Sequence, residues 1–136
     1  MAKLEVRVVA PEREIYSGEG DMVVAKGAAG DVGILPNHAP MLIRLAIHPV
    51  RILEGDRDKQ VVLVDGGFLH VTPGQGEEEP TRVDVLAEHA ALPEEIDAAA
   101  ARSRAEELRR KAEAEGTAEA QAELSKALMR AEFGGR

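Results

Sequence analysis

One tightly punctuated run, Gly30 to Leu42, constrains the fold of this chain more than any other segment. Its glycines, aspartate and asparagine permit the positive φ angles of turns, and its prolines withhold backbone donors, so a helix cannot pass through it. The apolar pair Ile34 and Leu35 and the later Met41 to Ile43 can enter a core. The run therefore predicts a turn, a short strand, a second turn and another strand.

Short β-rich segments recur between turn signals over the first two thirds of the chain. Residues 4–9 alternate apolar and polar, as a strand with one wet face does, whereas residues 61–64 are apolar throughout and should be covered on both faces. Asp65, Gly66 and Gly67 predict a turn between two strands. A βαβ unit is excluded because no helix-length period lies between the strands. The spacing suits a sandwich or a barrel, and we expect an all-β sandwich with strands at 4–9, 22–25, 41–45, 50–53, 61–64, 68–71 and 83–86.

The pattern changes to a helical one after residue 88. Pro93 suits a first helical position, and the acids and alanines that follow it favour a helix over about residues 93–114. Gly116 should end that helix and Thr117 should cap a second one over about residues 118–132. We therefore expect a β-sandwich domain over residues 1–88 and an antiparallel α-helical hairpin over residues 89–136. The second helix has a stripe at helical spacing: Ala120, Leu124, Ala127, Leu128 and Ala131.

The apolar stripe of the first expected helix is thin, because it consists of Ala101, Ala105, Leu108 and Ala112. Each buried methyl contributes on the order of 0.8 kcal/mol, against the entropy lost when long charged side chains become ordered. Docking of the hairpin should therefore be marginal, which favours a two-state element that is either folded on the sandwich or released toward a partner. The alternative is a hairpin that stays docked permanently.

Composition excludes several classes of partner and compartment. The net charge of -8 and the three aromatic residues argue against binding to nucleic acid or anionic lipid, which reward positive charge and stacking. The absence of cysteine excludes disulfides and thiolate metal sites. No run reaches the ~20 apolar residues of a membrane span, and the N-terminus lacks the apolar stretch of a signal peptide. We expect a protein that is neither membrane-spanning nor exported.

Catalytic and metal-binding motifs are not recognisable in the chain. Its four histidines, His38, His48, His70 and His89, lack any ligand spacing, so we expect no metal site. No nucleophile elbow or P-loop is present, and the glycines of residues 27–33 lead into prolines rather than into a helix N-terminus that could hold phosphate. These observations predict a protein that is not an enzyme and holds no cofactor.

Three blocks together carry a resemblance to a known family. They are the Gly-Asp-x-Gly-Ile-Leu-Pro-x-His-Ala-Pro pattern that begins at Gly30, the Gly-Gly pair within residues 64–71, and residues 83–88 just ahead of the helical tail. In this order and spacing the chain resembles, nearly end to end, the epsilon subunit of bacterial rotary (F-type) ATP synthases. The resemblance implies a non-catalytic central-stalk subunit that couples gamma to the c-ring of a proton-translocating enzyme, with a C-terminal hairpin that can inhibit ATP hydrolysis.

The resemblance also implies contact residues. The acidic position of the first block faces the proteolipid c-ring in similar proteins, so Asp31 with Gly30, Val32 and His38 becomes the expected c-ring and gamma contact. Similar subunits extend their hairpin along gamma toward an acidic segment of a catalytic beta subunit. The residues that would make this inhibitory contact are Arg109, Arg110, Lys111, Lys126 and Arg130.

Some members of the resembling family bind ATP on the folded hairpin through an Ile/Leu-Asp-x-x-Arg-Ala motif. Ile96 and Asp97 match its start, but alanine occupies the position of the arginine, and the nearest Arg-Ala pair begins at Arg104. Arg104 lies on almost the same helical face, roughly 6 Å farther along the axis than the motif requires. Ile96, Asp97 and Arg104 are therefore only candidates, and we expect no ATP bound to this subunit.

The resemblance also implies a cellular location, and the sequence leaves one alternative function open. The resemblance implies a peripheral protein at the cytoplasmic face of the plasma membrane, attached through the complex alone. The competing reading is a β-sandwich that senses a ligand, or a small enzyme, with the hairpin as its lid. Such a protein would need convergent polar groups in a pocket, and none can be assembled from the sequence.

Overall fold

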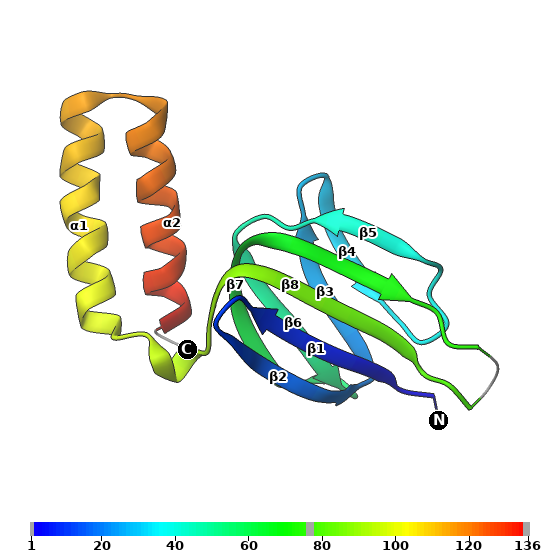
Figure 1. The fold of residues 1–136 in the computed structure, drawn as a ribbon. Coiled ribbons are helices and arrows are strands. Elements are labelled where there is room, and N and C mark those ends of the chain that lie inside the picture. The colour runs from blue at the N-terminus through cyan, green and yellow to red at the C-terminus, as the bar shows by residue number, and fades with distance from the viewer. Residues whose placement is uncertain (1, 76–77, 135–136) are drawn as a thin grey trace. The chain divides into compact units, whose positions relative to one another are not determined.

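The chain divides into two compact units, and the computed structural model describes residues 2–75 and 78–134 (Figure 1). The unit Met1–Ala91 contains the strands, and the unit Leu92–Arg136 contains the helices. The strand-rich unit extends beyond residue 88, because the last strand continues to Ala91 and pairs there with Leu63. None of the helices in the described residues is long and apolar enough to cross a membrane.

A single folded sheet forms the first unit. Its order is β2-β1-β8-β7-β6-β3-β4, with β5 paired to β7 outside this path. All neighbours are antiparallel except β1 and β8, which run parallel. The described part of the unit contains the strands β1 Leu4–Ala10, β2 Arg13–Gly20, β3 Met22–Gly27, β4 Gly30–Ile34, β5 Met41–Arg44, β6 His48–Glu54, β7 Arg57–Thr72 and β8 Thr81–Ala91.

The sandwich arises because the long strand β7 belongs to both of its layers. Its first half pairs with β6, and its last residues pair with β5, from Arg44 opposite Phe68 to Met41 opposite Val71. Between the halves Gly66 and Gly67 have φ angles of 77° and 120°, which other residues rarely adopt. The turn that the sequence predicted at Asp65 to Gly67 is therefore wrong: the glycines bend one continuous strand.

Alternating side chains from the two layers form the core. In β1 Leu4, Val6 and Val8 are fully buried while the residues between them face outward, as the sequence predicted. Residues 62–64 of β7 are all buried, which confirms the prediction from their unbroken apolar run. Each fully buried valine or leucine contributes about 1.5–3 kcal/mol relative to an exposed one, so these residues account for much of the stability of the sandwich.

β2 and β4 carry little apolar pattern; the sequence missed β2, whereas β4 is the short strand predicted within residues 30–42. β2 is rich in polar residues and glycine, and it forms because it is an edge strand that pairs with β1 from Leu4 opposite Gly20 to Ala10 opposite Arg13. β4 begins within the glycine-rich segment and continues to Ile34, pairing with β3. In both cases the strand forms because its backbone pairs with a neighbouring strand, although its own apolar alternation is weak.

The first long helix begins later than the sequence predicted. Pro93–Glu95 forms only a short 3₁₀ helix, η1, and Ile96 leaves the helical conformation with φ -99° and ψ 122°. Asp97 then acts as the N-cap of α1, Ala98–Glu115, because its Oδ1 accepts a 3.0 Å hydrogen bond from the N–H of Ala100. The predicted start at Pro93 is wrong because this carboxylate provides a better cap than the proline does.

The second unit is an antiparallel hairpin of α1 and α2, Ala118–Gly134 (Figure 1). Gly116 ends α1 with φ 62°, and Oγ1 of Thr117 accepts a 3.1 Å hydrogen bond from the N–H of Ala120, so both predicted helix signals are confirmed. The hairpin buries few large side chains. Its buried residues on the two long helices are Ala101, Ala105, Leu108, Ala112, Ala120 and Phe133.

Candidate interaction surfaces

The turn that carries Asp31 lies at one end of the sandwich. It joins β3 to β4, where Lys26 pairs with Asp31 and Gly27 pairs with Gly30, which has a φ of 139°. The side chain of Asp31 is exposed and that of Val32 is half-buried. A shallow hollow of about 270 Å³ lies beside the turn and is lined by Gly27, Ala28, Ala29, Gly30, Asp31, Val32, Ile43 and Arg44.

His38 lies in the loop beyond the other end of β4. Asn37 has a φ of 72°, and its backbone N–H donates a 2.8 Å hydrogen bond to Oγ1 of the buried Thr81. Nδ1 of His38 lies 2.7 Å from the carbonyl oxygen of Ala39. This loop is therefore held by hydrogen bonds at two successive residues, with the imidazole half-buried.

The expected contact residues thus occupy two separate places. Gly30, Asp31 and Val32 adjoin one another at the start of β4, whereas His38 follows the end of that strand at Ile34. The three residue-to-residue steps from Asp31 to Ile34 alone span about 10 Å in an extended strand. One small partner loop would not contact both groups, so they are better described as two contact points on one sandwich.

An apolar row on the outer face of β5, β7 and β8 was not found from the sequence. Phe68 lies opposite Leu86 in the β7–β8 pair, and Leu42 projects from the neighbouring β5. The exposed fractions of Leu42, Phe68 and Leu86 are 65 %, 42 % and 50 %. The alternation of Phe68 with the buried Leu69 was a signal that could have revealed this row. An outer sheet face normally carries polar side chains, so these three residues form a candidate surface for contact with another protein.

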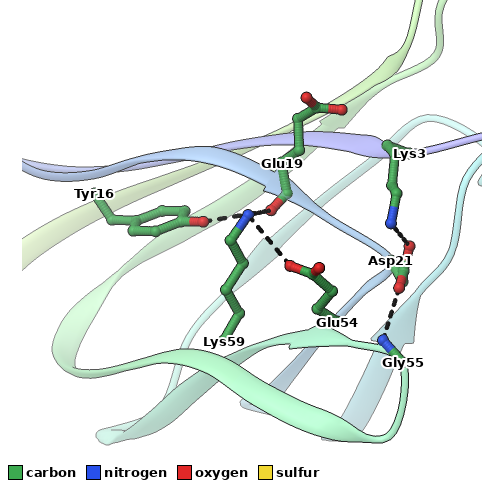
Figure 2. A network of polar contacts seen from close by, with 7 residues as sticks. All are labelled: Lys3, Tyr16, Glu19, Asp21, Glu54, Gly55 and Lys59. Atoms are coloured by element: carbon green, nitrogen blue, oxygen red, sulfur yellow. Dashed lines mark hydrogen bonds and ion pairs between the residues drawn. The ribbon is translucent and has the colours of Figure 1, made fainter.

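Charged groups tie the ends of several strands together (Figure 2). Nζ of Lys3 lies 2.5 Å from Oδ1 of Asp21, and Oδ2 of Asp21 accepts a 2.7 Å hydrogen bond from the N–H of Gly55. The Lys3 ammonium and the Gly55 N–H lower the pKa of Asp21, and hydrogen bonding to Asp21 raises the pKa of Lys3. Beside them Nζ of Lys59 donates to the carbonyl oxygen of Glu19 at 2.9 Å. These contacts join the residue before β1, the link between β2 and β3, and the β6–β7 turn, and they also join β2 to β7.

The hairpin has a hollow of its own between its two helices. It encloses about 340 Å³ and brings the candidates Ile96, Asp97 and Arg104 together with Arg130 of α2. The carboxylate of Asp97 is partly occupied in capping α1, and Arg104 pairs with Glu107 at 3.2 Å. The sequence identified Arg130 only as part of the cationic surface, because its approach to Asp97 depends on how α2 folds back.

The remaining hairpin cations lie on exposed helix faces. Arg109 pairs with Glu106 at 3.7 Å within α1, and Lys111 pairs with Glu123 of α2 at 3.6 Å. Arg110 and Lys126 are exposed. Exposed pairs of this kind contribute about 0–1 kcal/mol, so these cations can exchange their partners at little cost.

Residues 3–93 match the family described as "ATP synthase, Delta/Epsilon chain, beta-sandwich domain". A protein of Halalkalibacterium halodurans called ATP synthase epsilon chain is 40 % identical to this chain, with 100 % of each covered. The chain belongs to the ATP synthase epsilon chain family. A Brevibacillus brevis epsilon chain is 47 % identical over 78 % of this chain and 77 % of its own length. An epsilon chain of Thermobifida fusca is 44 % identical over 94 % of this chain and 89 % of its own length.

Two solved mitochondrial ATP synthase assemblies contain chains with the same fold. A chain in the Euglena gracilis mitochondrial ATP synthase, solved with OSCP, F1 and the c-ring, superposes with a TM-score of 0.74 at 21 % identity. The match covers 98 % of this chain and 79 % of that chain. A chain in the Tetrahymena thermophila central stalk and c-ring superposes with a TM-score of 0.53 over 70 % of each chain. These likenesses establish the β-sandwich followed by two helices as the fold of this family member.

Proposed function

We propose that this chain is a non-catalytic subunit of the central stalk of a proton-translocating ATP synthase, where it couples gamma to the c-ring. The observation that carries the proposal is the epsilon family match over residues 3–93, with relatives called ATP synthase epsilon chain over the whole length. The two superposed chains come from assemblies with F1 and a c-ring and with a central stalk and a c-ring. In this role the sandwich performs no reaction and transmits force between gamma and the c-ring.

The sandwich offers two surfaces for these partners. The exposed Asp31 and its glycine-bounded turn project beside a hollow and provide the polar contact with the c-ring, together with Gly30 and Val32. His38, on its hydrogen-bonded loop, and the apolar row of Leu42, Phe68 and Leu86 provide a surface for gamma. An exposed apolar row buried in a lasting complex contributes affinity that a polar face would not.

The hairpin supplies regulation. Its alanine-rich packing and its exposed ion pairs make the folded hairpin only marginally stable. The two helices can therefore separate and extend along gamma toward the beta subunit. In that form Arg109, Arg110, Lys111, Lys126 and Arg130 contact acidic groups of beta and restrain ATP hydrolysis. The cations lose only weak intramolecular pairs when they make this contact.

The subunit lies at the membrane only through its complex. A chain of net charge -8 is repelled by anionic headgroups, so the c-ring and gamma hold it in place. A stalk that carries the catalytic head of a bacterial ATP synthase projects from the cytoplasmic face of the plasma membrane, which is the location we propose for this chain.

A second role, nucleotide binding by the folded hairpin, is favoured by one observation. Arg104 and Arg130 line the same hollow as Ile96 and Asp97, so two cations are available even though alanine replaces the motif arginine. Two guanidinium groups from different helices suit a phosphate chain. Calorimetric titration of the chain with ATP tests this role: micromolar binding that Arg130→Gln weakens supports it, and an absence of heat contradicts it.

Charge reversal at the c-ring contact tests the main proposal. Asp31→Arg should leave co-purification with gamma intact while ATP-driven proton pumping by the reconstituted enzyme falls severalfold, because the reversed charge meets the wrong partner groups on the ring. Asp56→Arg, another exposed acid in a turn of the same sandwich, is the matched control and should behave as the unchanged chain. Equal pumping by the two variants would remove Asp31 from the contact.

A further inference from the structure

The last residue of α2 is in close contact with the segment that precedes α1. A Cβ atom built on Gly134 would lie 2.6 Å from Cγ2 of Ile96 and 3.2 Å from its Cβ. The first distance is shorter than real carbon contacts allow. Rotation about χ1 could move Cγ2, but it would leave the Cβ of Ile96 where it is. An alanine at this position would therefore require Ile96 or the end of α2 to shift.

Ile96 occupies a distinctive position in the chain. It follows η1, its N–H donates a 3.2 Å hydrogen bond to the carbonyl oxygen of Pro93, and its extended conformation separates η1 from α1. It is only 7 % exposed, and Phe133, which precedes Gly134, is 1 % exposed. The large apolar side chains of the hairpin are thus concentrated at its open end, whereas alanines line most of the rest of α1.

We infer that Gly134 and Ile96 form a latch that keeps the end of α2 against residues 92–97, the segment that leads from the first unit into the hairpin. Breaking the contact exposes Ile96 and loosens the end of α2. Apart from Leu108, the buried contacts that remain on α1 are those of alanines, so little holds α2 in place and it separates as a whole. The latch therefore sets the ratio of open to closed hairpin. Its consequence for ATP hydrolysis rests on the proposed function, but its existence does not.

The substitution Gly134→Ala tests the latch because two effects predict opposite changes in the stability of the closed hairpin. Alanine favours helix over glycine, so without a latch the variant should stabilise the last turn of α2. With the latch, the added methyl overlaps Ile96, and the ratio of open to closed hairpin should rise about fivefold or more, as overpacking of a tight contact does. The chain has no cysteine, so spin labels can be attached at Glu94→Cys and Glu132→Cys, both at exposed positions of the full chain.

Pulsed electron resonance distances between these labels give the populations directly. The long component, relative to the short one, should be larger by about fivefold or more in the Gly134→Ala chain than in the unchanged chain. Ile96→Ala in the otherwise unchanged chain removes the side chain on which the end of α2 packs, so it should raise the long component as well. Ile96→Val keeps the Cβ and Cγ2 carbons that face Gly134 and should keep the short distance. A short, unaltered distribution in the Gly134→Ala chain, or equal distributions in the Ile96→Ala and Ile96→Val chains, would overturn the latch.

Circular dichroism and ATP hydrolysis separate an opened hairpin from an unfolded chain. Unchanged helix and strand signals in the Gly134→Ala chain would show that a long component does not reflect general unfolding. In the assembled enzyme Gly134→Ala should lower ATP hydrolysis, because the released hairpin restrains it. Unchanged hydrolysis together with a long label distance would support the latch and contradict the proposed restraint. An unchanged label distance would contradict the latch whatever the hydrolysis rate.

Discussion

The backbone N–H of Asn37 donates a 2.8 Å hydrogen bond to Oγ1 of Thr81, which lies 44 positions later in the chain. Thr81 begins β8 and is 3 % exposed, and Asn37 has a φ of 72° in the loop between β4 and β5. A residue with such a φ keeps its conformation only where neighbouring groups hold it. The hydrogen bond therefore ties the loop that carries His38 to the sheet.

Thr81→Val should weaken this tie without changing side-chain shape. The variant leaves the N–H of Asn37 without its acceptor, so the free energy of unfolding should fall by about 1 kcal/mol. Urea denaturation measures the change, and amide hydrogen exchange at residue 37 should become faster. Thr81→Ser retains the hydroxyl and should keep slow exchange at that amide. Fast exchange in the serine variant and slow exchange in the valine variant would contradict the assignment.

The Lys3–Asp21 pair should make stability depend on pH at the acidic end. The pKa of Asp21 is lower in the folded chain than its ordinary value, so its contribution is complete above the unfolded pKa of about 3.9 and is lost as the pH falls through the folded pKa. Asp21→Asn should therefore lose less stability than the unchanged chain between about pH 5 and pH 2.

A matched control isolates this effect. Asp56→Asn removes an exposed acid from the turn beside Gly55 and should leave the acid-induced fall unchanged. The measurement is thermal unfolding of each variant across the acidic range. Parallel pH curves for the Asp21→Asn chain and the unchanged chain would show that the pair with Lys3 does not couple folding to protonation.

Gly67→Ala should destabilise the sandwich strongly. Gly67 has a φ of 120°, and a methyl group there would collide with the backbone oxygen of Leu86. The strained conformation and the steric overlap with β8 together should cost at least about 3 kcal/mol of unfolding free energy. Gly55→Ala is the control, because its φ of 64° imposes strain while nothing lies within 4 Å of the added methyl. Equal losses in the two variants would show that backbone strain alone sets the cost.

Leu86→Gln should weaken binding to gamma while leaving the fold unchanged. Leu86 is half exposed, so its replacement should alter the free energy of unfolding by less than about 0.5 kcal/mol. If the apolar row is buried by gamma, its loss should lower affinity tenfold or more, at about 1.4 kcal/mol for each factor of ten. Titration with gamma measures this, and Asp56→Asn, at an exposed position in the β6–β7 turn of the sandwich, serves as control. Equal affinities for both variants would remove the row from the interface.

Elements with a strong local pattern were predictable from the sequence. The alternation of Leu4, Val6 and Val8, the stop at Gly116 and the cap at Thr117 all act through neighbouring residues, and the structure confirms them. The three conserved-looking blocks did not need the structure either, since the family match confirms the resemblance they carried. Local chemistry and motif spacing were sufficient in these cases.

Features that depend on pairing between distant segments were not predictable. β2 exists because β1 offers it a partner, and Gly67 bends β7 because Leu86 of β8 approaches it. The hollow that joins Arg130 to Asp97 requires α2 to fold back on α1. Asp97 and Pro93 are both local signals for the start of the first long helix. The extended backbone at Ile96, which only the structure shows, places that start after Asp97.

The most direct test of the central claim compares two forms of the assembled ATP synthase, one with the full chain and one with a chain that ends at Ala91. The sandwich alone should still join gamma to the c-ring, so ATP-driven proton pumping should remain coupled, while ATP hydrolysis should rise because the hairpin no longer restrains it. Loss of coupling without the hairpin, or hydrolysis that is the same in both forms, would contradict a force-transmitting sandwich that carries a separate regulatory hairpin.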